Sequence, residues 1–250
     1  YGLTEPDAGA DLASVITRAE RKGDRVIVNG AKRFCTGASI ADYIYTLVKT
    51  DPSAPRYKNL SFVLVPRESA GLTITRMDGI GMRGATLTDV VFDGVDVPVE
   101  NVVGEEDGWN QGWPMLAGPA LDVEKLEVAA MALGLATAAL DDAWAYSFER
   151  KQFGQPIGAH QSVRHALADA KTRLLAARLV LQQASWLADE NKPCGVESSM
   201  AKLFVCETAE DIVLACQRVM GAYGCVRGVD MERYVSGILA FSTGGGSLSP

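Results

Sequence analysis

A glutamate on an apolar helical face is the first candidate for chemistry in this sequence. Residues 121–136, LDVEKLEVAAMALGLA, repeat apolar side chains at helical spacing. At 100° per residue, Glu124 shares one face with Val128, Met131, Leu135 and Ala138. Burying an unpaired charge costs several kcal/mol, so such a carboxylate is paired, protonated or functional. A structural interpretation stays open, since acidic residues also favour the first turn of a helix, where they offset its dipole.

The composition is that of an ordinary globular protein and narrows the possible partners. The 250 residues are 48% hydrophobic and 22% charged, with a formal net charge of −7. No apolar run approaches the roughly 20 residues that a membrane span needs, and no signal-like leader opens the sequence. Lysine and arginine do not cluster, which argues against nucleic acid as a partner. We therefore expect a soluble, cytoplasmic protein without a membrane span.

Cysteine and histidine usage makes disulfides and a metal site improbable. The five cysteines form no C-x-x-C pair and are odd in number, which favours reduced thiols in a cytoplasm-like compartment. The sequence contains only His160 and His165, too few for a histidine-based metal centre. We expect no metal.

The first part of the sequence, to about residue 105, is predicted to be β-rich. Short runs rich in β-branched and aromatic residues are separated by turn signals such as Gly23-Asp24 and Asn29-Gly30. The expected strands cover residues 25–29, 43–49, 60–66, 72–75 and 90–97. Short strands at this spacing predict a compact antiparallel barrel or sandwich.

Long helical patterns follow a stretch rich in Gly, Trp and Pro. We expect helices over about 121–152 and 162–190, with a break at 154–158, and a third that ends near Gly221. They lack heptad charges, so an up-down helical bundle is favoured over a coiled coil. The fold class is therefore α+β, with a β-barrel-like domain over 1–107 and a helical bundle over 108–250.

Five motifs, in order, resemble those of the acyl-CoA dehydrogenase family. Residues 1–11 are similar to the family's flavin loop Y-x-x-T-E-P-x-x-G-S-D, and residues 29–38 to N-G-x-K-x-W-I-T-N. The other three lie at residues 81–98 (GMRGAT and VFDGVDVP), 149–161 (ERKQFGQPI with HQ) and 217–224 (QRVMGAYG). The resemblance covers the family's middle β-domain and C-terminal helical domain. The N-terminal helical domain, which helps to wall the acyl pocket, is absent from this sequence.

The resemblance implies FAD-dependent α,β-dehydrogenation of an acyl-CoA thioester, as part of fatty acid or lipid metabolism. A base removes the α-proton while the β-carbon gives a hydride to flavin N5. Because a thioester α-proton is weakly acidic, the step needs a positioned base and donors for an enolate-like oxygen. The flavin carries the redox step, and the protein contributes positioning and electrostatics.

The resemblance also separates two possible origins of the base. Most family members carry it in an E-G-T segment near the C-terminus, where this sequence has Gly245 instead. A minority place it on the long helix in a D-x-E-R stretch, which residues 122–125 (DVEK) match. We therefore expect Glu124 to be the base, with Glu127 as the alternative. Desolvation is expected to raise the pKa of Glu124.

The flavin residues implied by the resemblance fall into two groups. The first group lies in the β-domain: Tyr1, Leu3, Thr4, Ala10, Phe34, Cys35 and Thr36. Phe34 stands where a tryptophan usually lies against the flavin ring, although pattern alone fits a plain strand pair with Thr36 equally well. The second group matches positions that reach a neighbouring subunit's FAD: Arg150, Gln152, Phe153, His160, Gln161, Gln217 and Gly221. A half-site that crosses chains implies a dimer or a dimer of dimers, that is, a homotetramer.

For the acyl-CoA, the resemblance implies contacts from Ala10, Leu121 and Lys125. Ala10 replaces the usual serine, and Lys125 an arginine. Ser236-Gly237 stands where the family usually has Arg-Asp, a departure that the sequence does not explain.

The expected electron acceptor is an electron-transfer flavoprotein, and a eukaryotic origin would indicate the mitochondrial matrix. Two alternatives stay open: a non-catalytic partner or scaffold subunit of such a flavoenzyme, and an acyl-CoA oxidase that uses O2. The acyl chain length or type cannot be read from these residues.

Overall fold

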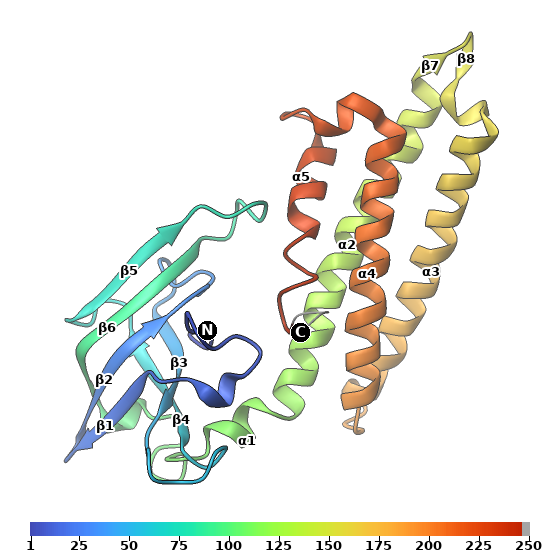
Figure 1. The fold of residues 1–250 in the computed structure, drawn as a ribbon. Coiled ribbons are helices and arrows are strands. Elements are labelled where there is room, and N and C mark those ends of the chain that lie inside the picture. Colours follow the sequence, from blue (N-terminus) through green and yellow to red (C-terminus); the bar gives the residue numbers. More distant parts are fainter. Residues whose placement is uncertain (247–250) are drawn as a thin grey trace. The chain divides into compact units, whose positions relative to one another are not determined.

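The computed structural model describes residues 1–246 and forms two compact units (Figure 1). The first unit contains residues 1–79 and 83–118, and the second contains residues 80–82 and the described residues from 119 on. Each unit has its own hydrophobic core, one between strands and one between helices. The expected α+β class, with a small barrel-like sheet followed by a bundle of long helices, is confirmed.

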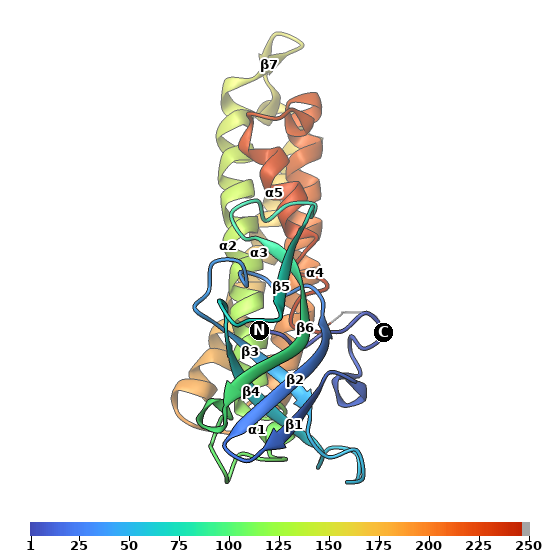
Figure 2. The same cartoon turned by 90° about the vertical axis from the view of Figure 1, so that its left-hand side faces the viewer.

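The first unit is built on a curled six-stranded sheet in the order β4-β3-β1-β2-β6-β5 (Figure 2). Its strands are β1 Arg18–Lys22, β2 Arg25–Lys32, β3 Tyr43–Lys49, β4 Leu60–Pro66, β5 Leu72–Met77 and β6 Leu87–Pro98. Neighbouring strands are antiparallel except for β1 and β3, which pair in parallel through Arg18 and Lys49. The sheet is therefore mixed, and the expected antiparallel pairing is found between all neighbouring strands except β1 and β3.

Buried and partly exposed residues alternate along the first half of β2, so one face of this strand packs into the core of the first unit. Val26 and Val28 are fully buried, as the period of two in a strand requires. The register against β6 shifts between Val28 and Gly30, which marks a bulge. Beyond the bulge Lys32 also points inward, with 1% of its surface exposed. A lysine in this position needs a partner, and the Glu5 carboxylate supplies one at 2.9 Å.

A short helix and three one-turn segments complete the loops of the first unit and the helix junctions. Helix α1 spans Gly112–Leu116 and belongs to the first unit. The one-turn 3-10 segments are η1 Leu12–Ser14, η2 Val99–Asn101 and η3 Ile157–Ala159, and a longer one, η4, spans Gly221–Cys225. The units change over between Gly118 and Pro119.

The second unit is a bundle of helices that lie side by side (Figures 1 and 2). The helices are α2 Pro119–Glu149, α3 Gln161–Asp189, α4 Gly195–Met220 and α5 Asp230–Ile238. A short hairpin of two-residue strands, β7 Lys151–Gln152 and β8 Gln155–Pro156, joins α2 to α3. Alanines on the inner face of α2, such as Ala132, Ala136 and Ala139, are fully buried and let α4 approach closely. The expected break at 154–158 is therefore this hairpin.

Helix α5, which the sequence analysis did not predict, explains the Ser236-Gly237 departure in packing terms. A Cβ atom placed on Gly237 would lie 3.1 Å from Leu135 Cδ1 of α2, closer than most Cβ contacts. Ser236 is nearly buried, and its hydroxyl donates to the Arg233 carbonyl. Small residues at these two positions therefore allow α5 to pack tightly on α2. Of the helices that the structure describes, none is long and apolar enough for a membrane crossing.

Candidate functional site

Glu124 lies in the first turns of α2 in a partly buried environment. Burial raises the pKa of its carboxyl above the ordinary value, and the nearby negative charge of Glu127 raises it further. Glu127 itself is exposed. Along the stripe, Val128 is buried and Leu135 packs against the helical core, whereas Met131 is 48% exposed. Of the two candidate bases, Glu124 is therefore the carboxylate that is partly withdrawn from water.

The chain returns to Glu124 through its last described segment, residues 241–246, which we call the tail. Gly245 adopts φ +63°, a conformation that favours glycine. A Cβ atom at this position would lie 2.9 Å from Val128 Cγ2 and 3.9 Å from Glu124 Oε1. A side chain at position 245 would therefore start beside the Glu124 carboxyl, so the tail and α2 could each supply a carboxylate at this place.

Polar contacts fix the start of α2 against α4. Lys125 Nζ lies 3.1 Å from Asp122 Oδ1 and 3.0 Å from Ser199 Oγ. The Ser198 hydroxyl donates to the same Asp122 oxygen over 3.1 Å. Leu121 is partly buried. The ammonium group of Lys125 is thus paired within the chain, beside Glu124 in sequence but about 100° away around the helix.

In the first unit, a buried ion pair holds the loop of residues 1–11. Glu5 accepts hydrogen bonds from the backbone N–H groups of Ile16 (2.7 Å) and Thr17 (2.8 Å), and from Lys32 Nζ (2.9 Å). Lys32 also donates to the Leu3 carbonyl over 2.9 Å. Burial alone would raise the pKa of Glu5, but Lys32 and the two N–H groups together lower it. Burial lowers the pKa of Lys32 to about 8, which leaves it mostly protonated at pH 7.

The strand-pair interpretation of Phe34 and Thr36 was wrong. Both residues lie beyond the end of β2, and Phe34 has φ +59°, an outlier for a bulky residue. Its ring is 52% exposed, and the Arg33 guanidinium carbon lies 5.5 Å from the ring centroid. Thr36 is also exposed. A strained loop that presents an aromatic face and a hydroxyl to solvent fits the surface of a flat ligand.

Cys35, between these two residues, is buried and serves as their anchor. Its backbone N–H donates to the Thr88 carbonyl over 2.8 Å, and the Thr88 hydroxyl donates back to the Cys35 carbonyl over 2.6 Å. Burial raises the pKa of the Cys35 thiol to about 11, so it stays a neutral thiol at pH 7. Only its backbone could contact a ligand.

The remaining predicted residues of the loop differ in how much surface they offer. Tyr1 is exposed and packs edge-on against Tyr45, with ring centroids 5.6 Å apart. Leu3 packs against a small buried cluster, and the Thr4 carbonyl accepts a bond from the Arg33 N–H over 2.8 Å. Ala10 is exposed. The structure therefore joins Thr4 to the strand that leads into Phe34.

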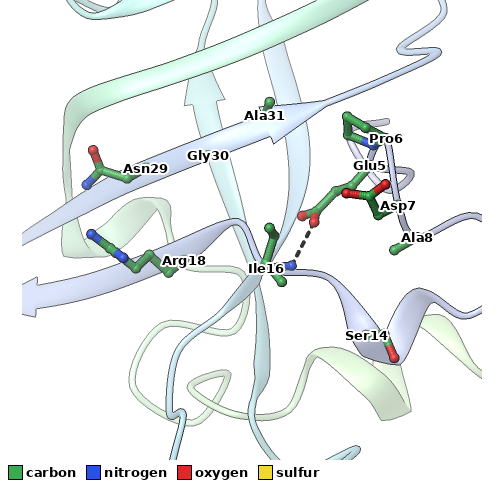
Figure 3. Close-up of a pocket in the computed structure, with 10 residues that line it drawn as sticks. All are labelled: Glu5, Pro6, Asp7, Ala8, Ser14, Ile16, Arg18, Asn29, Gly30 and Ala31. Atoms are coloured by element: carbon green, nitrogen blue, oxygen red, sulfur yellow. Dashed lines mark hydrogen bonds between the residues drawn. The ribbon is translucent and has the colours of Figure 1, made fainter.

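A pocket of about 460 Å³ lies behind this loop (Figure 3). Residues 5–8 line it on one side, opposite Ile16, Arg18 and residues 29–31 of β2. The residues predicted to bind flavin or substrate are all described by the structure, and none of them lines this pocket. The Glu5 carboxylate at its wall already accepts three hydrogen bonds, so it is not a free base.

The second predicted flavin group gathers at the opposite end of α2 from Glu124. The Arg150 guanidinium carbon lies 5.8 Å from the ring centroid of Tyr223 in η4, and Gln217 Nε2 lies 3.0 Å from Cys225 Sγ. At the hairpin, Phe153 is 93% exposed, with φ +54°, and contacts the ring of His160 edge-on at 5.8 Å.

Weaker contacts complete this group. His160 Nε2 lies 3.4 Å from the Gln152 carbonyl, Gln161 Nε2 lies 3.5 Å from His165 Nε2, and Gln217 Nε2 lies 3.5 Å from the Gly221 carbonyl. The contact between Arg150, which precedes the hairpin, and Tyr223 brings together two segments that are distant in sequence, the hairpin and η4.

Sequence reasoning missed several residues that shape these sites. Lys32 and Glu5 lie within the family motifs and were given no role of their own, although a lysine at a core-facing strand position indicates a buried ion pair. Lys202 on α4 and Tyr223 on η4 were also missed. Lys202 follows Ser198 by four residues and precedes Cys206 by four, so a lysine in an apolar stripe was again the available signal. No cluster of three potential metal ligands exists among the residues that the structure describes.

Family models match nearly the whole chain. The acyl-CoA dehydrogenase middle domain matches residues 1–95, and the acyl-CoA dehydrogenase C-terminal domain matches residues 110–248. An acyl-CoA dehydrogenase of Bacillus subtilis is 36% identical over 235 residues, which are 93% of this chain and 60% of that protein. A subunit of the caffeyl-CoA reductase–Etf complex of Acetobacterium woodii is 36% identical over 234 residues, again 93% of this chain and 60% of that protein.

Solved structures agree with these matches. The structure of a probable acyl-CoA dehydrogenase from Mycobacterium abscessus superposes with a TM-score of 0.94 at 31% identity, covering 99% of this chain and 64% of that chain. The chain thus spans roughly three fifths of the length of these relatives. The chain belongs to the acyl-CoA dehydrogenase family.

Proposed function

We propose that the protein catalyses FAD-dependent α,β-dehydrogenation of an acyl-CoA thioester, with Glu124 as the base that removes the α-proton. The observation that carries the proposal is the partly buried Glu124 carboxyl, which lies beside the place where a side chain at position 245 would start. A base poised by burial has a raised pKa and accepts a proton more readily than a solvated carboxylate does. Glu127 is a weaker candidate because it is exposed.

The residues of the first unit suit the FAD that this chemistry needs. Phe34 offers an exposed ring on a backbone with positive φ, and Thr36 offers a hydroxyl on the same loop. Their loop is tied to the sheet through Cys35, and the loop that carries Leu3 and Thr4 is tied through the buried Glu5–Lys32 pair. We assign the isoalloxazine to these residues. FAD, when bound, supplies the acceptor for the β-hydride.

The hairpin end of α2 favours a second FAD contact that comes from another subunit. Glu124 and Glu149 are about 25 residues apart on one helix, or about 37 Å at 1.5 Å per residue. One flavin ring cannot touch both ends of such a helix. We therefore infer that Arg150, Gln152, Phe153 and their neighbours serve the FAD of a second copy, so that the active protein is a homo-oligomer built as a dimer or a dimer of dimers.

The proposed electron acceptor is an electron-transfer flavoprotein. The Acetobacterium woodii relative, by its name, forms a complex with such a partner. An oxidase that uses O2 and a non-catalytic scaffold subunit are the competing assignments. The retained Glu124 opposes the scaffold, because a subunit without catalysis has no need of a desolvated carboxylate.

The test is Glu124→Gln in the full-length flavoprotein, with Glu127→Gln as the matched control. Anaerobic bleaching of the flavin band is followed after mixing with a panel of acyl-CoA thioesters. We expect Glu124→Gln to bind FAD normally and to bleach at least about 10²-fold more slowly, and Glu127→Gln to stay near wild type. Wild-type-like bleaching by Glu124→Gln would remove Glu124 from the mechanism.

The same experiment separates the alternatives. Wild-type protein that bleaches with no thioester in the panel would support the scaffold assignment. Rapid return of the flavin band on admission of air, without an added acceptor, would support the oxidase. Slow return in air, with fast return when an electron-transfer flavoprotein is added, is the expected result.

A further inference from the structure

Lys202 is a lysine on the inner face of α4, and it is 5% exposed. Its neighbours on this face, Ser198, Val205 and Cys206, are also buried. Within the described residues 1–246, Lys202 forms no ion pair with a carboxylate. Its Nζ instead donates a short hydrogen bond to the backbone carbonyl of Gly246. A buried ammonium group therefore depends on the tail for its acceptor.

The hydrogen bond to Gly246 attaches the tail to α4. A bond from a charged donor is roughly twice as strong as one between neutral groups, so it is a firm attachment. The Gly244 N–H donates to the Ala240 carbonyl over 2.9 Å, which closes a turn just before the attachment point. Gly245 at φ +63° and Gly246 at φ +98° then take a path that a residue with a side chain would resist.

The tail held in this way passes beside Glu124. Gly245 approaches so closely that a Cβ atom there would lie 2.9 Å from Val128 Cγ2 and 3.9 Å from Glu124 Oε1. Val128 is buried, so the tail backbone lies on the apolar stripe of α2 next to the carboxyl. Removal of the tail would admit water to Glu124.

We propose that Lys202 is a positioning residue for Glu124: it fixes the tail against α2, and the tail keeps water away from the carboxyl. The inference rests on the proposed function, because it takes Glu124 as the base. Lys202 contacts the backbone of residue 246, so it acts on Glu124 through the tail.

The charged groups around Glu124 make the sign of the effect diagnostic. On α2 they are Glu127 and the paired Asp122 and Lys125, whereas the printed contact of the α4 charge Lys202 is with the tail backbone at Gly246. The tail itself carries no titratable side chain. If Lys202 acts by holding the tail, its loss hydrates Glu124 and lowers the pKa of the carboxyl. If Lys202 acted by its charge, its loss would raise that pKa.

The experiment compares Lys202→Met with Lys202→Arg in the full-length flavoprotein, and uses Lys171→Met, an exposed lysine of α3, as the control. The pH profile of kcat/KM reports the base of the free enzyme. We expect Lys202→Met to move the acid limb to lower pH and to reduce kcat about tenfold or more. Lys202→Arg should restore both in part, since it keeps the donor charge. The control should match wild type.

Two further measurements keep the result interpretable. Hydrogen exchange at the Gly244 amide should quicken in Lys202→Met, which shows directly that the tail has come loose. Gly246→Ala keeps Lys202 but strains the tail backbone, so it should shift the acid limb in the same direction. It also serves if Lys202→Met does not fold.

An acid limb that stays in place while the tail exchanges faster would overturn the proposal, and so would a limb that moves to higher pH. These failures differ from failure of the proposed function. Full activity of Glu124→Gln would refute the base, whereas an inactive Glu124→Gln with an unmoved limb in Lys202→Met would refute the role of Lys202 alone.

Discussion

The buried Glu5–Lys32 pair makes a strong prediction about the loop that carries Leu3 and Thr4. Lys32→Met keeps most of the volume of the side chain but removes its charge. The Glu5 carboxylate then stays buried with only the Ile16 and Thr17 N–H groups as donors. Breaking a buried pair by removing one partner costs about 3–5 kcal/mol, mostly as the penalty for the charge left behind.

This cost should appear first as local opening of the loop. About 3 kcal/mol corresponds to a change of roughly a hundredfold or more in an equilibrium constant. We therefore expect the amide protons of Ile16 and Thr17 to exchange at least about a hundredfold faster in Lys32→Met. FAD should be lost more readily on dialysis, because the loop is a proposed part of its site.

The matched control is an exposed pair in the same sheet. Arg25 Nε lies 2.8 Å from Asp96 Oδ1, with both side chains roughly half exposed, and pairs of this kind contribute about 0–1 kcal/mol. Arg25→Met should change the two exchange rates by less than about tenfold. The double variant Glu5→Gln/Lys32→Met should recover part of the loss. Exchange in Lys32→Met within a factor of a few of wild type would refute the reasoning.

Two further predictions concern acid and the tail. The pKa of Glu5 is lower in the folded protein than its ordinary value of 4.5, so its stabilising contribution is complete above pH 4.5 and is lost as the pH falls through the lowered folded pKa. Acid unfolding followed by circular dichroism below pH 4.5 should be steep in wild type and shallower in Glu5→Gln. Identical acid transitions in the two proteins would contradict this role of Glu5. Gly245→Ala adds a Cβ atom that would lie 2.9 Å from Val128 Cγ2, on a backbone with φ +63°. The substitution should destabilise the protein by about 1–3 kcal/mol and slow flavin bleaching by acyl-CoA. An unchanged melting temperature together with unchanged bleaching would show that the tail is not held against α2.

Patterns in the sequence predicted the elements whose burial is regular. β3 and β4 lie at the expected residues, and α2, α3 and α4 begin or end within a few residues of the expected positions. The five expected strands and three helices carry apolar residues at periods of 2 or 3.6. This period on the buried face can be read from the sequence whichever residues occupy the exposed face. The helical unit was therefore largely readable before its structure was known.

The elements that were missed have a different physical origin. β1 reads RAERK, with only Ala19 buried, so its pairing depends on neighbours rather than on its own pattern. The parallel contact between β1 and β3 is a tertiary feature that no local pattern encodes. α5 did carry a signal, since Met231, Tyr234 and Ile238 recur at helical spacing and are buried, but Gly237 inside so short a segment weakens the helical pattern.

The candidate site divides in the same way. Glu124 could be found from a carboxylate on an apolar stripe together with the glycine at position 245. The positive φ of Phe34 could not be found, because an aromatic residue two positions before the β-branched Thr36 fits a plain strand pair. The Lys202 contact joins residues 44 apart in sequence, and only the folded chain brings them together.

The uninterrupted run of α2 from Pro119 to Glu149 also restricts how this protein can change its length. Each residue of an α-helix advances its neighbours by about 100° around the axis. One amino acid inserted or deleted between Glu124 and the hairpin would swing Phe153 around the cylinder by more than a quarter of a circle while leaving the carboxyl where it was. Insertions are therefore tolerable there only in near-whole turns. This helix fixes both the distance between its two ends and the rotation of one end relative to the other about the helix axis.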